Sequence, residues 1–380
     1  MTEKGLHRFL ALMTCVHFVN DGFEMVVPTL LPAMALSLGL SYAEIGIVGS
    51  ALVVAMGLGQ AFVGAFSDYF GHKKLIIFLG VFSTSVAFLL MSISDSFIML
   101  VAANLLAGFG LSIYHPVGIA MITNMFSSRQ GKAIGIHGVG GNLGMFLFPI
   151  IAGVLADLLG WRTTLAIFPM IGIFITIIYL IRCPEEDVDL SGFEPRKLLV
   201  PALAIIIISG GLLNIAMRGF ITFFPVTVRE LGASSSVVGG YLSIYFGMGA
   251  LGQYIGGWLS DNRDILRSIL LFGSIATVSM YLTISYPETA IMYVFLALAG
   301  LTENLLWPLF YVLYARHTPK EMRGTGLGVF FSMAYLFAAT SPVIMGSVAH
   351  HISLESSYLV ILAAGAAGSI FILFVRLARR

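Results

Sequence analysis

The chain has 380 residues, of which 58% are hydrophobic and only 10% are charged, and its formal net charge is +1. A soluble domain carries about 25% charged residues, so this composition excludes an ordinary soluble protein. Long apolar stretches recur from end to end, which indicates a polytopic helical membrane protein.

Twelve apolar segments are expected to form membrane-spanning helices. The first six are expected at 9–34, 43–67, 75–94, 97–123, 131–157 and 163–182. A polar segment follows at 183–197, and the last six are expected at 198–226, 237–259, 266–285, 289–313, 322–347 and 356–376. The predicted fold class is therefore all-α, a polytopic membrane protein of twelve transmembrane helices.

Little sequence remains for a soluble catalytic domain, and no GxxxxGK[ST] nucleotide loop is present. We find no metal-binding cluster and no nucleophile–base pair in the sequence. We therefore expect no enzyme, no cofactor, no metal and no nucleic-acid partner. The expected partners are the lipid bilayer, a small-molecule solute and protons, and the expected state is a monomer.

The distribution of basic residues predicts the orientation of the chain. If the N-terminus is cytoplasmic, 17 of the 20 Lys and Arg residues fall on the cytoplasmic side. Only Arg162 and Arg229 then fall outside, and Arg218 lies within a span. Because Lys and Arg concentrate in cytoplasmic loops, we expect both termini in the cytoplasm and the protein in the plasma (inner) membrane.

The second half of the chain repeats the first at an offset of 193 residues. The pairs that match at this offset include Gln60 and Gln253, Asp68 and Asp261, Gly135 and Gly328, Pro149 and Pro342, and Gly153 and Gly346. This repeat predicts an N-terminal six-helix bundle at 1–182, a cytoplasmic linker at 183–197 and a C-terminal six-helix bundle at 198–380. Parallel repeats with a binding site between them are typical of secondary transporters.

The stretch GAFSDYFGHKK, residues 64–74, resembles the loop signature of the major facilitator superfamily (MFS). The match rests on Gly64, Asp68, Gly71, Lys73 and Lys74. The second copy, GWLSDNRD, keeps Gly257 and Asp261. The resemblance implies the MFS fold, in which two six-helix bundles are related by a pseudo-two-fold axis.

Asp68 is expected at a helix end beside a basic loop, where a carboxylate can pair with bases and with a neighbouring helix N-terminus. We therefore predict a conformational latch between the halves, with an ordinary basic loop as the alternative. Its predicted members are Gly64, Asp68, Gly71, Lys73, Lys74 and Asp261.

Four charged residues lie well inside the predicted spans: Asp21, Glu24, Arg218 and Glu303. Each costs about 2.5–3.5 kcal/mol at a helix centre on insertion scales, so such residues usually face a cavity or a partner. Because a carboxylate in an apolar cavity can load and release protons near neutral pH, we predict proton coupling through Asp21, Glu24 or Glu303, with Asp21 the first candidate. Arg218 is expected either to form a structural ion pair with Asp21 or Glu24 or to bind an anionic group of the solute.

The polar residues of the first span share one helical face. His17, Asn20, Asp21 and Glu24 follow the i, i+3, i+4, i+7 spacing of such a face. Together with polar residues of later spans, this face predicts a solute-binding cavity. The predicted binding residues are His17, Asn20, His115, Asn142, Asn214, Arg218, Asn304 and Trp307.

Two stretches resemble the fosmidomycin-resistance type of efflux protein within the superfamily. One is His17-x-x-Asn20-Asp21, and the other is YHPVG at 114–118 followed by GVGGNLGMFLFP at 138–149. The resemblance implies a proton-coupled antiporter that exports a drug or another small organic solute. Two alternatives stay open: a uniporter or organic-anion exchanger that uses Arg218, and a transport-inactive membrane receptor or assembly factor.

Overall fold

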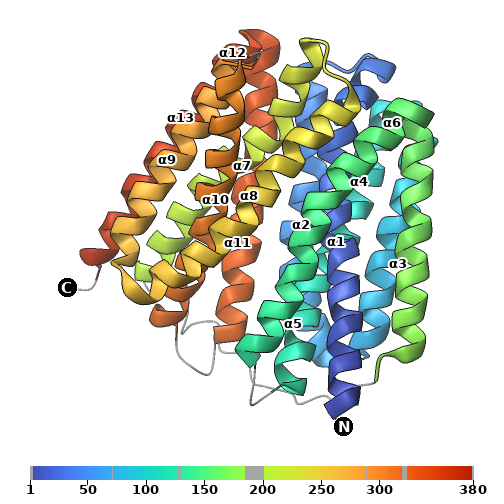
Figure 1. The fold of residues 1–380 in the computed structure, drawn as a ribbon, viewed down its shortest axis with the longest axis vertical. Helices are drawn as coiled ribbons and strands as arrows, with labels where there is room; N and C mark the ends of the chain where they lie inside the picture. The colour runs from blue at the N-terminus through green and yellow to red at the C-terminus, as the bar shows by residue number, and fades with distance from the viewer. Residues whose placement is uncertain are drawn as a thin grey trace.

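The computed structural model describes residues 3–70, 72–126, 130–184, 201–287, 289–318 and 323–378. The regular structure of these residues is helical (Figure 1). The long helices are α1 (Glu3–Leu38), α2 (Tyr42–Phe70), α3 (Lys73–Ser92), α4 (Phe97–Ser112), α5 (Tyr114–Met125), α6 (Gln130–Arg182), α7 (Pro201–Glu230), α8 (Ser235–Asn262), α9 (Ile265–Ser285), α10 (Ala290–His317) and α11 (Arg323–His351). The chain then ends in α12 (Leu354–Ser357), α13 (Leu359–Phe371) and a short 3-10 helix, Ile372–Arg376.

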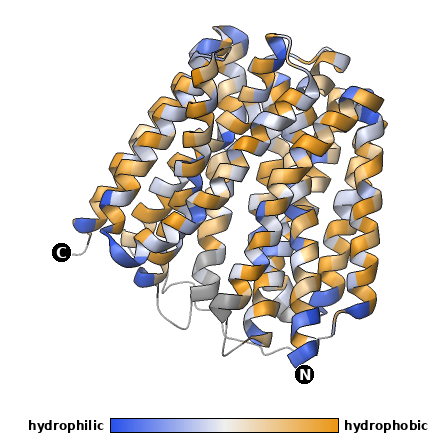
Figure 2. Ribbon diagram, in the orientation of Figure 1, coloured by the Kyte–Doolittle hydropathy of each residue, from blue (hydrophilic) through white to orange (hydrophobic). Residues whose placement is uncertain are grey.

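Within the described ranges, ten helical segments are long and apolar enough to cross a membrane. Hydrophilic residues gather at the ends of the helices, whereas hydrophobic residues dominate their middle parts (Figure 2). Large apolar side chains such as Met170 and Phe174 are exposed on the outside, where lipid can cover them. The multi-pass helical fold is thus confirmed, while the count of twelve spans and the cytoplasmic side of the termini stay predictions.

Two of the expected spans lie on either side of a break in α6, and a third is divided into two helices. Gly160 interrupts α6 with a non-helical backbone (φ 79°, ψ 158°), so the helical parts on its two sides correspond to the spans expected at 131–157 and 163–182. The span expected at 97–123 breaks at Ile113 into α4 and α5. Pro116 favours the new start, because proline has no N–H to donate and its fixed backbone angle suits the first turn of a helix.

The two halves of the chain meet along two helix pairs, α2 with α11 and α6 with α8. A Cβ placed on Gly46 of α2 would lie 2.2 Å from the Pro342 carbonyl oxygen of α11. A Cβ on Gly239 of α8 would lie 2.2 Å from the Pro149 carbonyl oxygen of α6. Gly239 follows Gly46 by 193 residues, and Pro342 follows Pro149 by the same interval. The repeat seen in the sequence therefore recurs in the contacts between the halves, although the domain boundaries stay a prediction, and most of the expected linker lies outside the described residues.

These glycine contacts lie at the end of the bundle that is remote from the N-terminus, which we call the closed end. There the Asp157 carboxylate of α6 accepts hydrogen bonds from the backbone N–H groups of Ser235 and Ser236, both at 2.8 Å, and so caps the start of α8. At the opposite end, a Cβ on Gly135 or Gly328 would have no neighbouring heavy atom within 4 Å. Figure 1 shows the helices leaning apart toward the lower end, where the N-terminus lies.

Candidate functional site

A buried ion pair joins α1 of the first half to α7 of the second half. Arg218 Nη2 donates a hydrogen bond to Glu24 Oε1, and both side chains are almost completely buried. The sequence left either Asp21 or Glu24 as the partner of Arg218, and the structure selects Glu24. The Nε atom of Arg218 is also buried, and no group among the described residues accepts a hydrogen bond from it.

Asp21, one turn earlier on α1, lies between two histidines. Its Oδ2 is 2.9 Å from His17 Nε2 and its Oδ1 is 3.2 Å from His115 Nε2. Asn20 Nδ2 donates to the same Oδ1 at 3.2 Å. The structure therefore brings together four of the predicted site residues, three from α1 and one from α5.

The first part of α6 supports this group through residues that the sequence did not assign to the site. His17 Nδ1 lies 3.0 Å from the His137 carbonyl oxygen, and the two imidazole rings stack with centroids 4.1 Å apart. A Cβ on Gly141 would lie only 2.5 Å from Asp21 Oδ2 and 2.6 Å from His17 Cε1. Only a glycine leaves room for both groups, and the sole signal of this in the sequence was the glycine-rich run GVGGNLG.

Glu303 occupies a separate buried position on α10. Its carboxylate accepts hydrogen bonds from Tyr245 of α8 at 3.3 Å and from Trp307 Nε1 at 3.1 Å. With Asn214 it lines a cavity of about 10 Å³, which has room for one water at most. The sequence predicted Glu303, Trp307 and Asn214, but it gave no sign of Tyr245.

The remaining predicted amides contact backbone or the other half. Asn214 and Asn304 donate to carbonyl oxygens one turn earlier on their own helices, at 3.2 and 3.0 Å. Asn142 of α6 donates to Gln253 of α8 at 3.1 Å. Asn142 therefore lies at the interface between the halves, and its role as a solute ligand stays a prediction.

The predicted latch is only partly described. Gly64 lies in α2, Lys73 and Lys74 begin α3, and Asp261 is exposed near the C-terminal end of α8. Gly71 and the side chain of Asp68 lie outside the described residues. The latch therefore stays a prediction.

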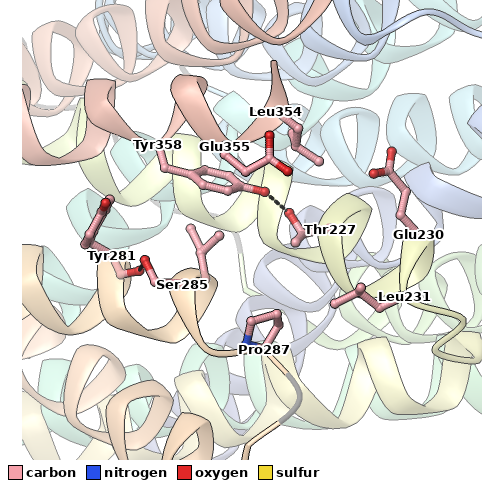
Figure 3. A pocket seen from close by; sticks show the side chains of 10 residues that line it. Thr227, Glu230, Leu231, Tyr281, Ser285, Pro287, Leu354, Glu355 and Tyr358 are labelled. Atoms are coloured by element: carbon pink, nitrogen blue, oxygen red, sulfur yellow. Dashed lines mark hydrogen bonds between the residues drawn. The ribbon is translucent and has the colours of Figure 1, made fainter.

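A larger cavity of about 310 Å³ lies at the closed end among α7, α9, α12 and α13 (Figure 3). The hydroxyl groups of Thr227 and Tyr358 are hydrogen-bonded to each other at its wall. Glu230, which also lines it, accepts a 2.5 Å hydrogen bond from Tyr42 of α2. Neither Asp21 nor Glu24 of α1 lines this cavity. We therefore do not assign the solute to it.

Known proteins with similar sequences are transporters. The fosmidomycin resistance protein of Escherichia coli (strain K12) is 24% identical over 369 residues, which cover 92% of this chain and 88% of that protein. The gentisate transporter of Corynebacterium glutamicum is 26% identical over 351 residues, which cover 86% of this chain and 78% of that protein.

Among solved structures, the fold is similar to that of a bacterial homolog of the human lysosomal transporter Spinster, in an inward-facing and occupied conformation. The TM-score is 0.83 at 18% sequence identity, with 100% of this chain and 98% of the other covered. The family model of the Major Facilitator Superfamily matches residues 13–286 and 206–380. The expectation of a transporter rather than an enzyme is thereby confirmed, and this chain belongs to the Major Facilitator Superfamily of membrane transporters.

Proposed function

We propose that the chain is a proton-coupled transporter that exports a small organic anion across the plasma membrane by alternating access. The observation that carries this proposal is the buried Glu24–Arg218 ion pair between α1 and α7. Under it, Arg218 is the anion-binding group and Glu24 carries the proton. We prefer Glu24 to Asp21 as the proton carrier, because the Asp21 oxygens contact His17, His115 and Asn20 rather than Arg218.

The energetics of buried charge explain how the pair would couple proton and solute. A buried ion is tolerated when it is paired, and an ion left alone is strongly destabilising. Protonation of Glu24 removes the charge that holds Arg218, and an anionic solute then supplies a replacement. Deprotonation restores the pair and displaces the solute. Proton and anion thus bind together, or neither binds, to each conformation that opens to one side.

A proton and a solute that bind only together move in the same direction. Export then runs down the outward gradient of an anion that accumulates in the cytoplasm, and each anion carries one proton out with it. The empty carrier returns with Glu24 deprotonated and paired to Arg218, so no buried charge is left alone in either step. The buried Nε of Arg218, which has no acceptor among the described residues, offers the anion a hydrogen-bond donor that Glu24 does not use.

The relatives support an anionic solute and an outward direction. Gentisate and cis,cis-muconate, for which two relatives are named as transporters, are both carboxylates. The likeness to a fosmidomycin resistance protein favours export. Glu303 stays a second candidate for the proton carrier, since its described hydrogen-bond donors are neutral.

An anion exchanger or uniporter is the second candidate function, and the same arginine favours it. In that case Arg218 binds the solute and Glu24 only compensates its charge. Arg218→Lys keeps the positive charge but loses the planar fork of donors that recognises a carboxylate bidentately. Loss of gentisate binding in this variant identifies Arg218 as a bidentate anion ligand under either function.

Proton coupling is tested in proteoliposomes loaded with labelled gentisate. We expect an imposed pH gradient to drive gentisate against its concentration gradient in the wild type. Glu24→Gln is expected to lose this uphill movement, whereas Glu3→Gln, at the exposed start of the same helix, keeps it. Equal transport with and without the gradient would show that the protein is a uniporter or exchanger. Uphill transport retained in Glu24→Gln but lost in Glu303→Gln would move the proton to α10.

A further inference from the structure

The group formed by His17, Asp21 and His115 has the composition of a metal site. One ligand atom from each residue, two imidazole nitrogens and a carboxylate oxygen, lies within 4.8 Å of the others. His17 and Asp21 are buried, and the His115 side chain is 22% exposed. Two imidazoles and a carboxylate with one coordination position left open are a common ligand set for Zn²⁺.

The hydrogen bonding of His17 determines which of its nitrogens can bind a cation. A carbonyl oxygen only accepts hydrogen bonds, so Nδ1, which lies 3.0 Å from the His137 carbonyl, carries a hydrogen atom. In the neutral imidazole the lone pair is then on Nε2, which faces Asp21. A histidine that ligates a metal usually donates its other ring N–H to a carbonyl or carboxylate in this way.

His17 Nε2 and Asp21 Oδ2 lie in direct contact, 2.9 Å apart. With the hydrogen atom of the neutral ring on Nδ1, this contact brings the lone pair of Nε2 against a carboxylate oxygen. A cation bound by both atoms removes the repulsion between them, which is the relation of two ligands of one metal ion.

The distances also fit a metal ion. With Zn–N and Zn–O bonds of about 2.0–2.2 Å, two ligand atoms of a tetrahedral site are roughly 3.4 Å apart. Here His17 Nε2 lies 2.9 Å from Asp21 Oδ2 and His115 Nε2 lies 3.2 Å from Asp21 Oδ1. The ligand atoms of the three residues are all within 4.8 Å of one another, so rotations of the side chains bring them to this spacing. Gly141 leaves the space on which the carboxylate and the His17 ring depend.

We propose that His17, Asp21 and His115 bind a divalent transition-metal ion of the Zn²⁺ type in the first half of the protein. All three ligands come from α1 and α5, so the ion does not join the halves. It adds positive charge one turn from the Glu24–Arg218 pair, and the partly exposed His115 side leaves a position for water or for an oxygen of an anionic solute. The site is independent of the proton carrier, because Glu24 is not a ligand.

Cobalt titration of the full-length protein tests the site, because tetrahedral Co²⁺ has strong visible absorption bands. The protein is purified in detergent with an affinity tag that contains no histidine. We expect the bands to appear on addition of Co²⁺ and to disappear when Zn²⁺ displaces it. His17→Gln and His115→Gln are expected to lose the bands, each with a thermal unfolding curve as cooperative as that of the wild type.

The control variants use histidines of the same chain. His350 and His351 are adjacent and exposed at the end of α11, and their joint replacement by Gln is expected to leave the bands unchanged. Glu24→Gln is also expected to bind Co²⁺ normally, so loss of proton coupling and loss of the metal site are separate results. The proposal is overturned if the wild type shows no tetrahedral bands at saturating Co²⁺, or if the bands persist without His17 or His115. Loss of the bands with the His350 and His351 pair would equally overturn it.

Discussion

Neutralising one member of the Glu24–Arg218 pair should destabilise the protein far more than neutralising both. The two side chains are only 6% and 3% exposed, and they connect α1 to α7. Removing one partner of a buried pair leaves an uncompensated charge and costs about 3–5 kcal/mol. An ordinary hydrogen bond between membrane helices is worth only about 0.6 kcal/mol on average, so the charge rather than the hydrogen bond sets the magnitude.

We therefore expect Glu24→Gln and Arg218→Gln each to lower the free energy of unfolding by about 3 kcal/mol or more. The double variant buries no charge at this position and should lie closer to the wild type than either single variant does. The coupling energy in the double-mutant cycle should then exceed about 3 kcal/mol, because the two single losses together are larger than the loss in the double variant by at least that amount. Unfolding in mixed detergent micelles, titrated with SDS, measures all four proteins.

The exposed pair of Asp264 and Arg376 is the matched control, with an N–O distance of 2.7 Å and side chains that are 43% and 47% exposed. Because water screens such pairs, the same cycle there should give a coupling of at most about 1 kcal/mol. The reasoning fails if each single variant at Glu24 or Arg218 stays within about 1 kcal/mol of the wild type. It also fails if the losses of the two single variants simply add in the double variant.

Three further changes test other contacts of the structure. In Gly46→Ala the new Cβ meets a carbonyl oxygen of α11 at 2.2 Å, so overpacking that costs about 1–3 kcal/mol should open the closed end. The control Gly240→Ala, where the new Cβ has no atom within 4 Å, should leave that end closed. Distances between spin labels across the closed end measure the opening in both variants. Asp157→Ala removes the acceptor of two backbone N–H groups at the start of α8, while the N-cap Ser234 remains. The change should cost about 0.5–2 kcal/mol and appear in the same distances as a smaller closed population, and an unchanged distribution would contradict a role in closure. Gly141→Ala places a Cβ 2.5 Å from the Asp21 carboxylate and should weaken Co²⁺ binding by about tenfold or more. Gly135→Ala, in open space on the same helix, should bind Co²⁺ like the wild type, and equal affinity in both variants would refute this steric argument.

The amino-acid sequence alone determined the class of the fold. Apolar segments of about 20 residues can satisfy their backbone groups in lipid only as helices, so composition was sufficient to predict a helical membrane protein. The 193-residue repeat predicted two matching bundles, and Gly46 and Gly239, which are 193 residues apart, make equivalent contacts. The helical period likewise placed Asp21 and Glu24 on one face of α1.

The sequence could not decide which groups pair across the bundle. Asp21 and Glu24 are three residues apart, and their spacing along α1 is compatible with either as the partner of Arg218. The rotation of α1 against α7 selects Glu24, and the approach of α5 and α6 leaves Asp21 to the histidines.

Two further features were equally beyond the sequence. The His137 carbonyl is a backbone group common to every residue type, and Gly141 is one glycine among 42. Local periodicity depends on neighbours within one or two turns, whereas these contacts join residues more than 100 positions apart. Only the packing of the helices against one another brings such residues together, and so only the tertiary structure decided the chemistry of the site.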